Sequence, residues 1–188
     1  MSGTRIRIVV PCYDEAARLD VTAFAKCLEE RPDTSFVFVN DGSTDDTSSV
    51  LHALAASHPT RMVALDLADN QGKAEAVRQG MLAAFASDAE LTGYWDADLA
   101  TPLDAIGDFV TTLDSEPTVD VVLGARVAML GHRIERKATR HYAGRVFATL
   151  ASMTLGLSVY DTQCGAKLLR SNDATRALFA EPFGSRWV

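Results

Sequence analysis

Short runs of β-branched and aromatic residues recur along the chain, and each run predicts a strand. The runs are almost continuously apolar, which is typical of strands that helices cover on both faces. They are RIRIVV (5–10), SFVFV (35–39), RMVALDL (61–67), LTGYW (91–95) and VDVVLG (119–124). Together they predict one buried sheet.

Stretches with helical spacing separate these runs. Apolar residues recur every four positions, at Leu19, Ala23 and Cys27 within 15–31 and at Val77, Met81 and Phe85 within 73–87. Strands that alternate with helices of this length form right-handed βαβ units around a parallel sheet. No repeat or low-complexity segment marks a linker, so we predict a single α/β domain.

Polar residues stand directly after the predicted strands. Taken singly, these segments have ordinary explanations: NDGS is typical of a turn with a helix cap, and Lys73 suits a solvated first helical turn. Ligands of open α/β sheets bind outside the carboxyl ends of the strands, so the coincidence of the segments favours a pocket at that edge. The segments are PCYDE (11–15), NDGSTDD (40–46), DNQGK (69–73), DAD (96–98) and GAR (124–126).

Two aspartates one residue apart, Asp96 and Asp98, end the aromatic run at 91–95. Two neighbouring carboxylates repel each other unless a positive partner lies between them. A hard cation such as Mg²⁺ or Mn²⁺ suits this pair, because such ions bind one or two carboxylates together with phosphate oxygens. The alternative is a capping Asp and a surface Asp before a helix that begins near Pro102.

Composition limits the classes of function. The chain has 188 residues, of which 47% are hydrophobic and 23% charged, and a net charge of −7. These values are typical of a globular protein and argue against nucleic-acid binding. Three widely spaced cysteines, Cys12, Cys27 and Cys164, predict neither a disulfide framework nor a zinc site.

The sequence has neither the apolar region of a signal peptide nor a run of about 18 apolar residues. We therefore expect a cytoplasmic protein without a transmembrane helix, acting in solution or at the inner face of the membrane. No pattern in the sequence predicts the oligomeric state.

Five segments, in this order, resemble motifs of the family 2 inverting glycosyltransferases: VVPCYDEAARL, VFVNDGSTDDT, NQGKAEAVRQGM, YWDADLATP and DTQCGAKLLR. The resemblance spans nearly the whole chain and is closest to the dolichyl-phosphate glucosyltransferase and polyprenyl-phosphate mannosyltransferase group. It implies a GT-A (Rossmann-like) single domain over residues 1–188, with a mostly parallel central sheet flanked by helices. It also implies that a C-terminal portion found in relatives is missing here.

The resemblance implies a nucleotide-diphosphate sugar as donor, of the UDP-glucose or GDP-mannose type, with Mg²⁺ or Mn²⁺ as cofactor. Asp96, Ala97 and Asp98 match the metal and diphosphate motif, and Lys73 matches a residue near the base and ribose. Nucleotide contacts are further implied for Pro11, Tyr13, Glu15, Val39 and Asp41. Arg126 matches a basic residue that faces phosphates, and Arg140 matches one for the acceptor phosphate.

Some residues depart from the family pattern. Asp14 stands where many relatives have Asn, and Asn40 replaces the first Asp of their DDG turn. Ala100 replaces a metal-binding Gln of the mannosyl branch, and Gly144 replaces a Ser near the acceptor phosphate. These changes favour the glucosyltransferase branch and leave a third protein ligand of the metal unidentified.

The segment 124–146 bears on the acceptor, since it is basic within an acidic protein. Its cations are Arg126, Arg133, Arg136, Lys137, Arg140 and Arg145. Such a run is usually a solvated helix face, but arginine forks also match the oxygens of a polyprenyl or dolichyl phosphate. The apolar stripe within 142–157 suits core packing, or a peripheral approach to an anionic membrane.

A lipid phosphate is already ionised and needs no general base, whereas a hydroxyl acceptor needs a carboxylate. Asp161 is the candidate for that base, while Cys164 suits a buried small residue better than a nucleophile. The alternatives are therefore a glycosyltransferase with a hydroxyl acceptor and a non-catalytic nucleotide-sugar binding protein. A nucleotidyltransferase would carry a Gly-rich loop after the first strand, which PCYDEAARL is not.

Overall fold

The computed structural model describes residues 3–125 and 164–187. Contacts between residues divide the chain into two compact units, one of residues 1–122 with 165–188 and one of residues 123–164. The second unit lies almost entirely outside the described residues, so the elements below are essentially those of the first. Among the described residues, no helix has the length and apolar character needed to cross a membrane.

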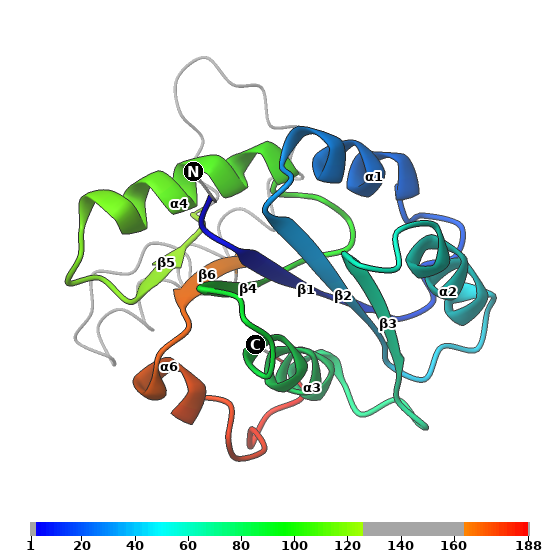
Figure 1. Cartoon of the computed structure of the whole chain (residues 1–188). Coiled ribbons are helices and arrows are strands. Elements are labelled where there is room, and N and C mark those ends of the chain that lie inside the picture. The colour runs from blue at the N-terminus through cyan, green and yellow to red at the C-terminus, as the bar shows by residue number, and fades with distance from the viewer. Residues whose placement is uncertain (1–2, 126–163, 188) are drawn as a thin grey trace, which may run out of the picture. The chain divides into compact units, whose positions relative to one another are not determined.

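The described strands form one sheet of six, in the order β3-β2-β1-β4-β6-β5 (Figure 1). β1 pairs in parallel with β2 and β4, β2 pairs in parallel with β3, and β6 runs antiparallel to β4. The bounds are β1 (Ile6–Cys12), β2 (Thr34–Asn40), β3 (Met62–Asp66), β4 (Leu91–Trp95), β5 (Val121–Leu123) and β6 (Ala166–Arg170). This confirms the predicted α/β class and mostly parallel sheet, and adds β6, which the apolar runs did not predict.

Helices connect the strands: α1 (Val21–Glu30), α2 (Thr47–Ser57), α3 (Lys73–Phe85), the 3-10 turn η1 (Leu103–Ala105), α4 (Ile106–Ser115) and α6 (Asp173–Ala177). The predicted helical stretch 15–31 is helical only from Val21. Arg18 and Leu19 instead donate their backbone N–H groups to the carbonyl of Glu15, which makes a turn. Asp20 then caps α1 by accepting from the N–H of Ala23 at 3.0 Å.

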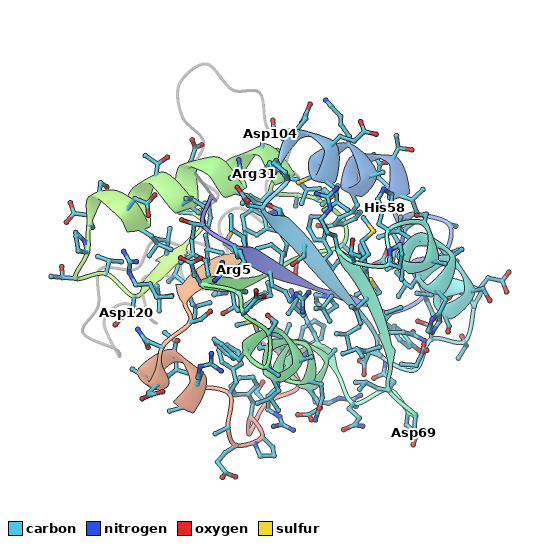
Figure 2. The ribbon with its side chains drawn as sticks, in the orientation of Figure 1. Arg5, Arg31, His58, Asp69, Asp104 and Asp120 are labelled. Carbon is cyan, nitrogen blue, oxygen red and sulfur yellow. The ribbon has the colours of Figure 1, made fainter. Side chains whose placement is uncertain are left out.

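The helices cover both faces of the sheet, as the apolar strands require. Right-handed crossovers place α1 and α2 on one face and α3 on the other, because the chain reverses direction across the sheet after β3 (Figure 1). On the α1 face, Phe24 packs edge-to-face on Phe36 and Phe38. On the α3 face, Val9, Val39, Val77 and Met81 belong to one buried cluster. Charged side chains such as Asp69, Asp104 and Asp120 are exposed and project from the loops and helix ends (Figure 2).

The strand register sets which loops meet. Cys12 at the end of β1 lies opposite Asn40, and Asn40 lies opposite Asp66. β4 runs in the same direction and ends at Trp95, which faces Ala166 at the start of β6. The four loops that follow the parallel strands and the segment that enters β6 therefore lie at one edge of the sheet.

Candidate functional site at the carboxyl edge of the sheet

The loop after β1 is fixed to the loop after β2 through Asp14. Its N–H donates to Ser43 Oγ at 3.0 Å, and its Oδ1 accepts from the N–H of Thr44 at 2.8 Å. Asp14 has a φ of 50°, a conformation that Asp and Asn tolerate better than other side chains. The position thus needs a short side chain with an acceptor oxygen, which Asp and Asn both provide.

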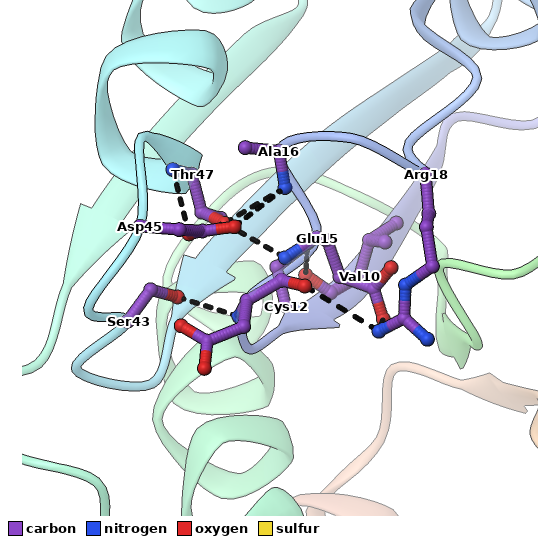
Figure 3. A network of polar contacts seen from close by, with 9 residues as sticks. Val10, Cys12, Glu15, Ala16, Arg18, Ser43, Asp45 and Thr47 are labelled. Carbon is purple, nitrogen blue, oxygen red and sulfur yellow. Dashed lines mark hydrogen bonds and ion pairs between the residues drawn. The ribbon is translucent and has the colours of Figure 1, made fainter.

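Thr47 clamps the next residues of the same loop (Figure 3). Its buried hydroxyl accepts from the N–H groups of Glu15 at 2.8 Å and Ala16 at 3.0 Å, and it donates to the carboxylate of Asp45. Asp45 also accepts from the N–H of Ala16 at 3.1 Å. The start of α2 therefore holds the backbone from which the Glu15 side chain projects.

Glu15 connects this loop to the acidic pair after β4. Burial raises the pKa of Glu15, the neighbouring Arg18 guanidinium opposes that increase, and the charges of Asp98 and Asp45 add to it. Arg18 donates to Glu15 Oε1 at 2.9 Å. The effect of the Asp98 charge on Glu15 indicates that the loop after β1 and the DAD loop after β4 lie near each other.

Asp41 orders the loop that follows β3. It is 2% exposed, and its two oxygens accept from the N–H groups of Gln71 at 2.8 Å and Gly72 at 2.9 Å. The sequence predicted a nucleotide contact for Asp41, which stays a prediction. In the structure its carboxylate holds the turn that leads into Lys73.

Asn40, the second departure from the family pattern, needs its amide. Its Nδ2 donates to Asp66 Oδ1 at 2.8 Å, while its Oδ1 accepts from the N–H of Ser43 at 3.1 Å. An ionised Asp at this position has no hydrogen to donate and would face the Asp66 carboxylate directly. Asn40 and Asp66 therefore make a matched pair.

The C-terminal segment supports the same loop from outside. The carbonyl of Arg186 accepts from the N–H of Ala74, in the first turn of α3, at 3.0 Å. The Arg186 guanidinium donates to Asn70 Oδ1 at 2.6 Å. The NQGK turn is thus held from the sheet side by Asp41 and from the other side by Arg186.

Lys73 is the positive partner of Asp96, the first residue of the acidic pair. Its Nζ lies 2.5 Å from Asp96 Oδ1, and the two side chains are 25% and 30% exposed. Asp96 Oδ1 is buried and receives no well-aligned hydrogen bond, so the contact is an ion pair by distance. Asp98 is exposed and accepts from the N–H of Ala100 at 3.0 Å.

The donor set of Asp96 and Asp98 fits a hard cation. Both are carboxylates, and one has a buried oxygen that hydrogen bonds do not satisfy, which a divalent ion can satisfy in their place. Within residues 3–125 and 164–187, no three His, Cys, Asp or Glu side chains gather around one metal position. The remaining ligands of such an ion therefore have to come from elsewhere, for example from the phosphates of a nucleotide.

The other predicted donor-site residues differ in access. Tyr13 is 43% exposed and Pro11 is half-buried. Val39 and Ala97 are buried, so any contact that they make with a nucleotide has to come from the main chain. The predicted Arg126, Arg140 and Asp161 lie outside the described residues.

Cys164 is buried, as the sequence predicted, and so are Cys12 and Cys27; all three are free thiols. Burial and the nearby Glu15 carboxylate raise the pKa of the Cys12 thiol far above its ordinary value, which keeps it protonated.

Sequence reasoning missed three residues of the site: Thr47, Asp45 and Gly165. The first two look like ordinary helix-start residues in the sequence, and Gly165 is marked only by its place in the DTQCG segment.

Comparison with known proteins places the chain among sugar-transferring enzymes. The family described as Glycosyl transferase family 2 matches residues 7–176. A dolichyl-phosphate beta-glucosyltransferase of Trichomonas vaginalis is 31% identical and aligns with 95% of this chain and 55% of its own length. The corresponding enzyme of Drosophila melanogaster is 32% identical, over 97% of this chain and 59% of its own. The chain thus spans somewhat more than half of these relatives.

The fold has solved counterparts. Glucosyl-3-phosphoglycerate synthase of Mycobacterium tuberculosis, in complex with UDP, superposes with a TM-score of 0.59 over 90% of this chain and 57% of its own, at 19% identity. A second crystal structure of that enzyme, with Mn²⁺, UDP and glucosyl-3-phosphoglycerate, gives a TM-score of 0.58 at 18% identity, over 90% of this chain and 57% of its own. At this identity the likeness supports the GT-A type of sheet and no individual residue.

Proposed function

Because this chain belongs to glycosyl transferase family 2, we propose that it is an inverting hexosyltransferase with a lipid-phosphate acceptor. It takes a hexose from a nucleotide-diphosphate sugar, of the UDP-glucose or GDP-mannose type, and passes it to a polyprenyl or dolichyl phosphate. The names of the relatives that align with nearly the whole chain support this acceptor.

The observation that carries the proposal is which partners the carboxylates have at the carboxyl edge of the sheet. Asp41 and Asp45 each accept at least two backbone hydrogen bonds from neighbouring segments, whereas Asp96 faces an ammonium and the exposed Asp98 accepts one, from Ala100 of its own loop. A site that holds a diphosphate through a cation needs carboxylate oxygens that the backbone hydrogen bonds of other loops do not already occupy.

Asp96 and Asp98 would hold Mg²⁺ or Mn²⁺, which supplies positive charge to the departing nucleoside diphosphate. Lys73 adds a fixed ammonium at the same carboxylate, and the Asp41 turn keeps it there. Exposed Tyr13 and half-buried Glu15 would line the nucleotide side of the site.

Arg126 and Arg140 would hold the acceptor phosphate, by bidentate contacts that lysine cannot reproduce. Since a lipid phosphate is ionised at neutral pH, this acceptor needs no general base. The basic segment 124–146 then suits a reaction at the inner face of a membrane with anionic lipids. With a hydroxyl acceptor, Asp161 would take the role of base.

The test is a panel of nucleotide sugars assayed with polyprenyl phosphate and with a neutral sugar alcohol, each with Mn²⁺ and with EDTA. We expect metal-dependent transfer to the phosphate and little transfer to the alcohol. Arg140→Lys should lower transfer about 10- to 100-fold while nucleotide binding stays near that of the wild type. Equal transfer to the alcohol, with no effect of Arg140→Lys, would replace the lipid phosphate by a hydroxyl acceptor. Nucleotide binding without transfer to any acceptor would support a binding protein instead.

A further inference from the structure

Gly165 lies directly opposite Asp96 where β4 and β6 begin to separate. The antiparallel register pairs Trp95 with Ala166, so Asp96 and Gly165 are the next pair. The Asp96 N–H donates to the Gly165 carbonyl at 2.9 Å, which extends the ladder by one bond. Directly opposed residues of antiparallel strands place their side chains on the same face.

The Asp96 carboxylate fills the space that a side chain at Gly165 would need. A Cβ atom added to Gly165 would lie 1.8 Å from Asp96 Oδ2 and 2.0 Å from its Cγ. The glycines with a positive φ within the described residues are Gly42 and Gly72. Glycine is therefore required at position 165 because a side chain would not fit there, and not because the backbone adopts an unusual conformation.

A second glycine of the same strand pair makes the contrast clear. A Cβ atom at Gly93 would lie 2.2 Å from the carbonyl oxygen of Lys167, so that glycine lets two backbones approach. Gly165 instead accommodates an acidic side chain, whose Oδ1 lies 2.5 Å from Lys73 Nζ. The carboxylate is thus confined between the backbone of the segment entering β6 and the first residue of α3.

We propose that Gly165 is a positioning residue, which sets the orientation of the Asp96 carboxylate toward the cation of the donor site. The proposal rests on the proposed function, because it assigns the glycine of DTQCG to the metal carboxylate. Any side chain at position 165 turns the carboxylate out of its slot and away from Lys73. The segment that enters β6 thereby becomes part of the donor site, although it contributes no functional group.

The first experiment measures Mn²⁺ binding in the presence of UDP for the wild type, Gly165→Ala and Gly184→Ala. Gly184 is the matched control, because a Cβ atom there meets nothing within 4 Å. Loss of a group that orients a metal ligand typically lowers metal affinity about 10- to 100-fold, so we expect that loss for Gly165→Ala alone. A wild-type affinity for Mn²⁺ in Gly165→Ala overturns the proposal.

The second experiment measures thermal unfolding in EDTA for Gly165→Ala, in the wild type and in an Asp96→Ala background. If the carboxylate is the group displaced, Gly165→Ala lowers the melting temperature less when Asp96 is already Ala. An equal decrease in both backgrounds overturns the proposal, since the damage would then come from the strand alone. If the wild type binds no Mn²⁺, the metal role in the proposed function fails, and this unfolding cycle alone decides whether Gly165 positions Asp96.

Discussion

In the loop after β2, Asp41 and Asp45 use their carboxylates to hold the backbone of neighbouring loops, whereas in the loop after β4 neither carboxylate holds the backbone of another described loop. Asp41 accepts from the N–H groups of Gln71 and Gly72, and Asp45 accepts from those of Ala16 and Thr47. In the loop after β4, Asp96 Oδ1 receives no well-aligned hydrogen bond, and the exposed Asp98 accepts from the N–H of Ala100.

The difference teaches which carboxylates of an acidic edge are structural. An oxygen that accepts backbone hydrogen bonds in a buried place has little capacity left for a cation, and its loss leaves N–H groups without partners. An oxygen that no backbone N–H group needs, such as Asp96 Oδ1, can bind a metal at smaller cost, because no N–H group loses its acceptor. Both kinds occur here within short acidic stretches, NDGSTDD and DAD, whose composition alone does not separate them.

Asp96→Asn should have the largest effect on activity, because it changes a carboxylate that is left for the cation. The carboxamide has nearly the same size but cannot supply an anionic ligand, so we expect Mn²⁺-dependent transfer to fall by about 10²- to 10³-fold. The melting temperature should change little, because Asp96 makes few hydrogen bonds through its side chain. Initial rates and thermal unfolding of Asp96→Asn and of the control Asp104→Asn, an exposed acid on η1, provide the check. Wild-type rates in Asp96→Asn would contradict the role of this carboxylate.

Asp41→Ala should show the opposite profile, with stability as its main loss. Removing the buried carboxylate leaves the N–H groups of Gln71 and Gly72 without their acceptor, which should cost about 2–4 kcal/mol of unfolding free energy. Chemical denaturation of Asp41→Ala measures this cost. Asp69→Ala is the control, because Asp69 is an exposed acid of the loop after β3, which Asp41 holds (Figure 2). Equal stability of the two variants would show that Asp41 does not hold the turn.

The sequence predicted the convergence of the loops, because strand order and direction follow from alternating strands and helices. It did not predict the state of each carboxylate, which depends on local backbone geometry such as the positive φ of Asp14. The strand β6 was also missed. Its residues AKLLR include Lys167 and Arg170 and so make no apolar run, and its pairing with β4 joins Ala166 to Trp95 across 71 positions of the chain.

Lys73 shows the same limit for a single side chain. The sequence left two explanations open, a solvated first-turn residue and a residue on the base and ribose side of the donor. The structure gives it a different partner, since its ammonium contacts Asp96, a residue of another loop. No spacing in the sequence predicts that contact, because the turn held by Asp41 decides where α3 begins.

Thr47→Val tests the clamp on the first loop and should have a smaller effect. Valine keeps the shape of the buried side chain but leaves the N–H of Glu15 without its acceptor, at a cost of about 1–2 kcal/mol. UDP should also bind less tightly, because Glu15 loses its fixed backbone. Ser49→Ala, at an exposed position of α2, is the control for denaturation and for calorimetry with UDP. An unchanged unfolding free energy in Thr47→Val would show that the Thr47 hydroxyl does not stabilise the first loop.

The smallest expected effect is the pH dependence of the stability that Asp66 contributes. Within the described part of the chain, this carboxylate accepts from the side chains of Asn40, Ser48 and His52 and not from the backbone. Hydrogen bonds from His52, and then from Asn40, lower the pKa of Asp66. The stabilisation is therefore complete above the ordinary range of an Asp, near pH 4, and is lost as the pH falls through the lowered value. The His52 and Asp66 side chains are 55% and 40% exposed, so solvent screening limits the contribution to below about 1 kcal/mol.

Asp66→Asn removes the charge but keeps an oxygen that can accept from Asn40. The difference in unfolding free energy between wild type and variant should then be largest near neutral pH and shrink as the pH falls below about 4. Urea denaturation at a series of pH values measures that difference. A difference that stays constant down to about pH 3 would mean that the neutral hydrogen bonds carry the whole effect. Asp66 would then join Asp41 and Asp45 as an acceptor for its neighbours, and its charge would contribute nothing measurable to the edge of the sheet.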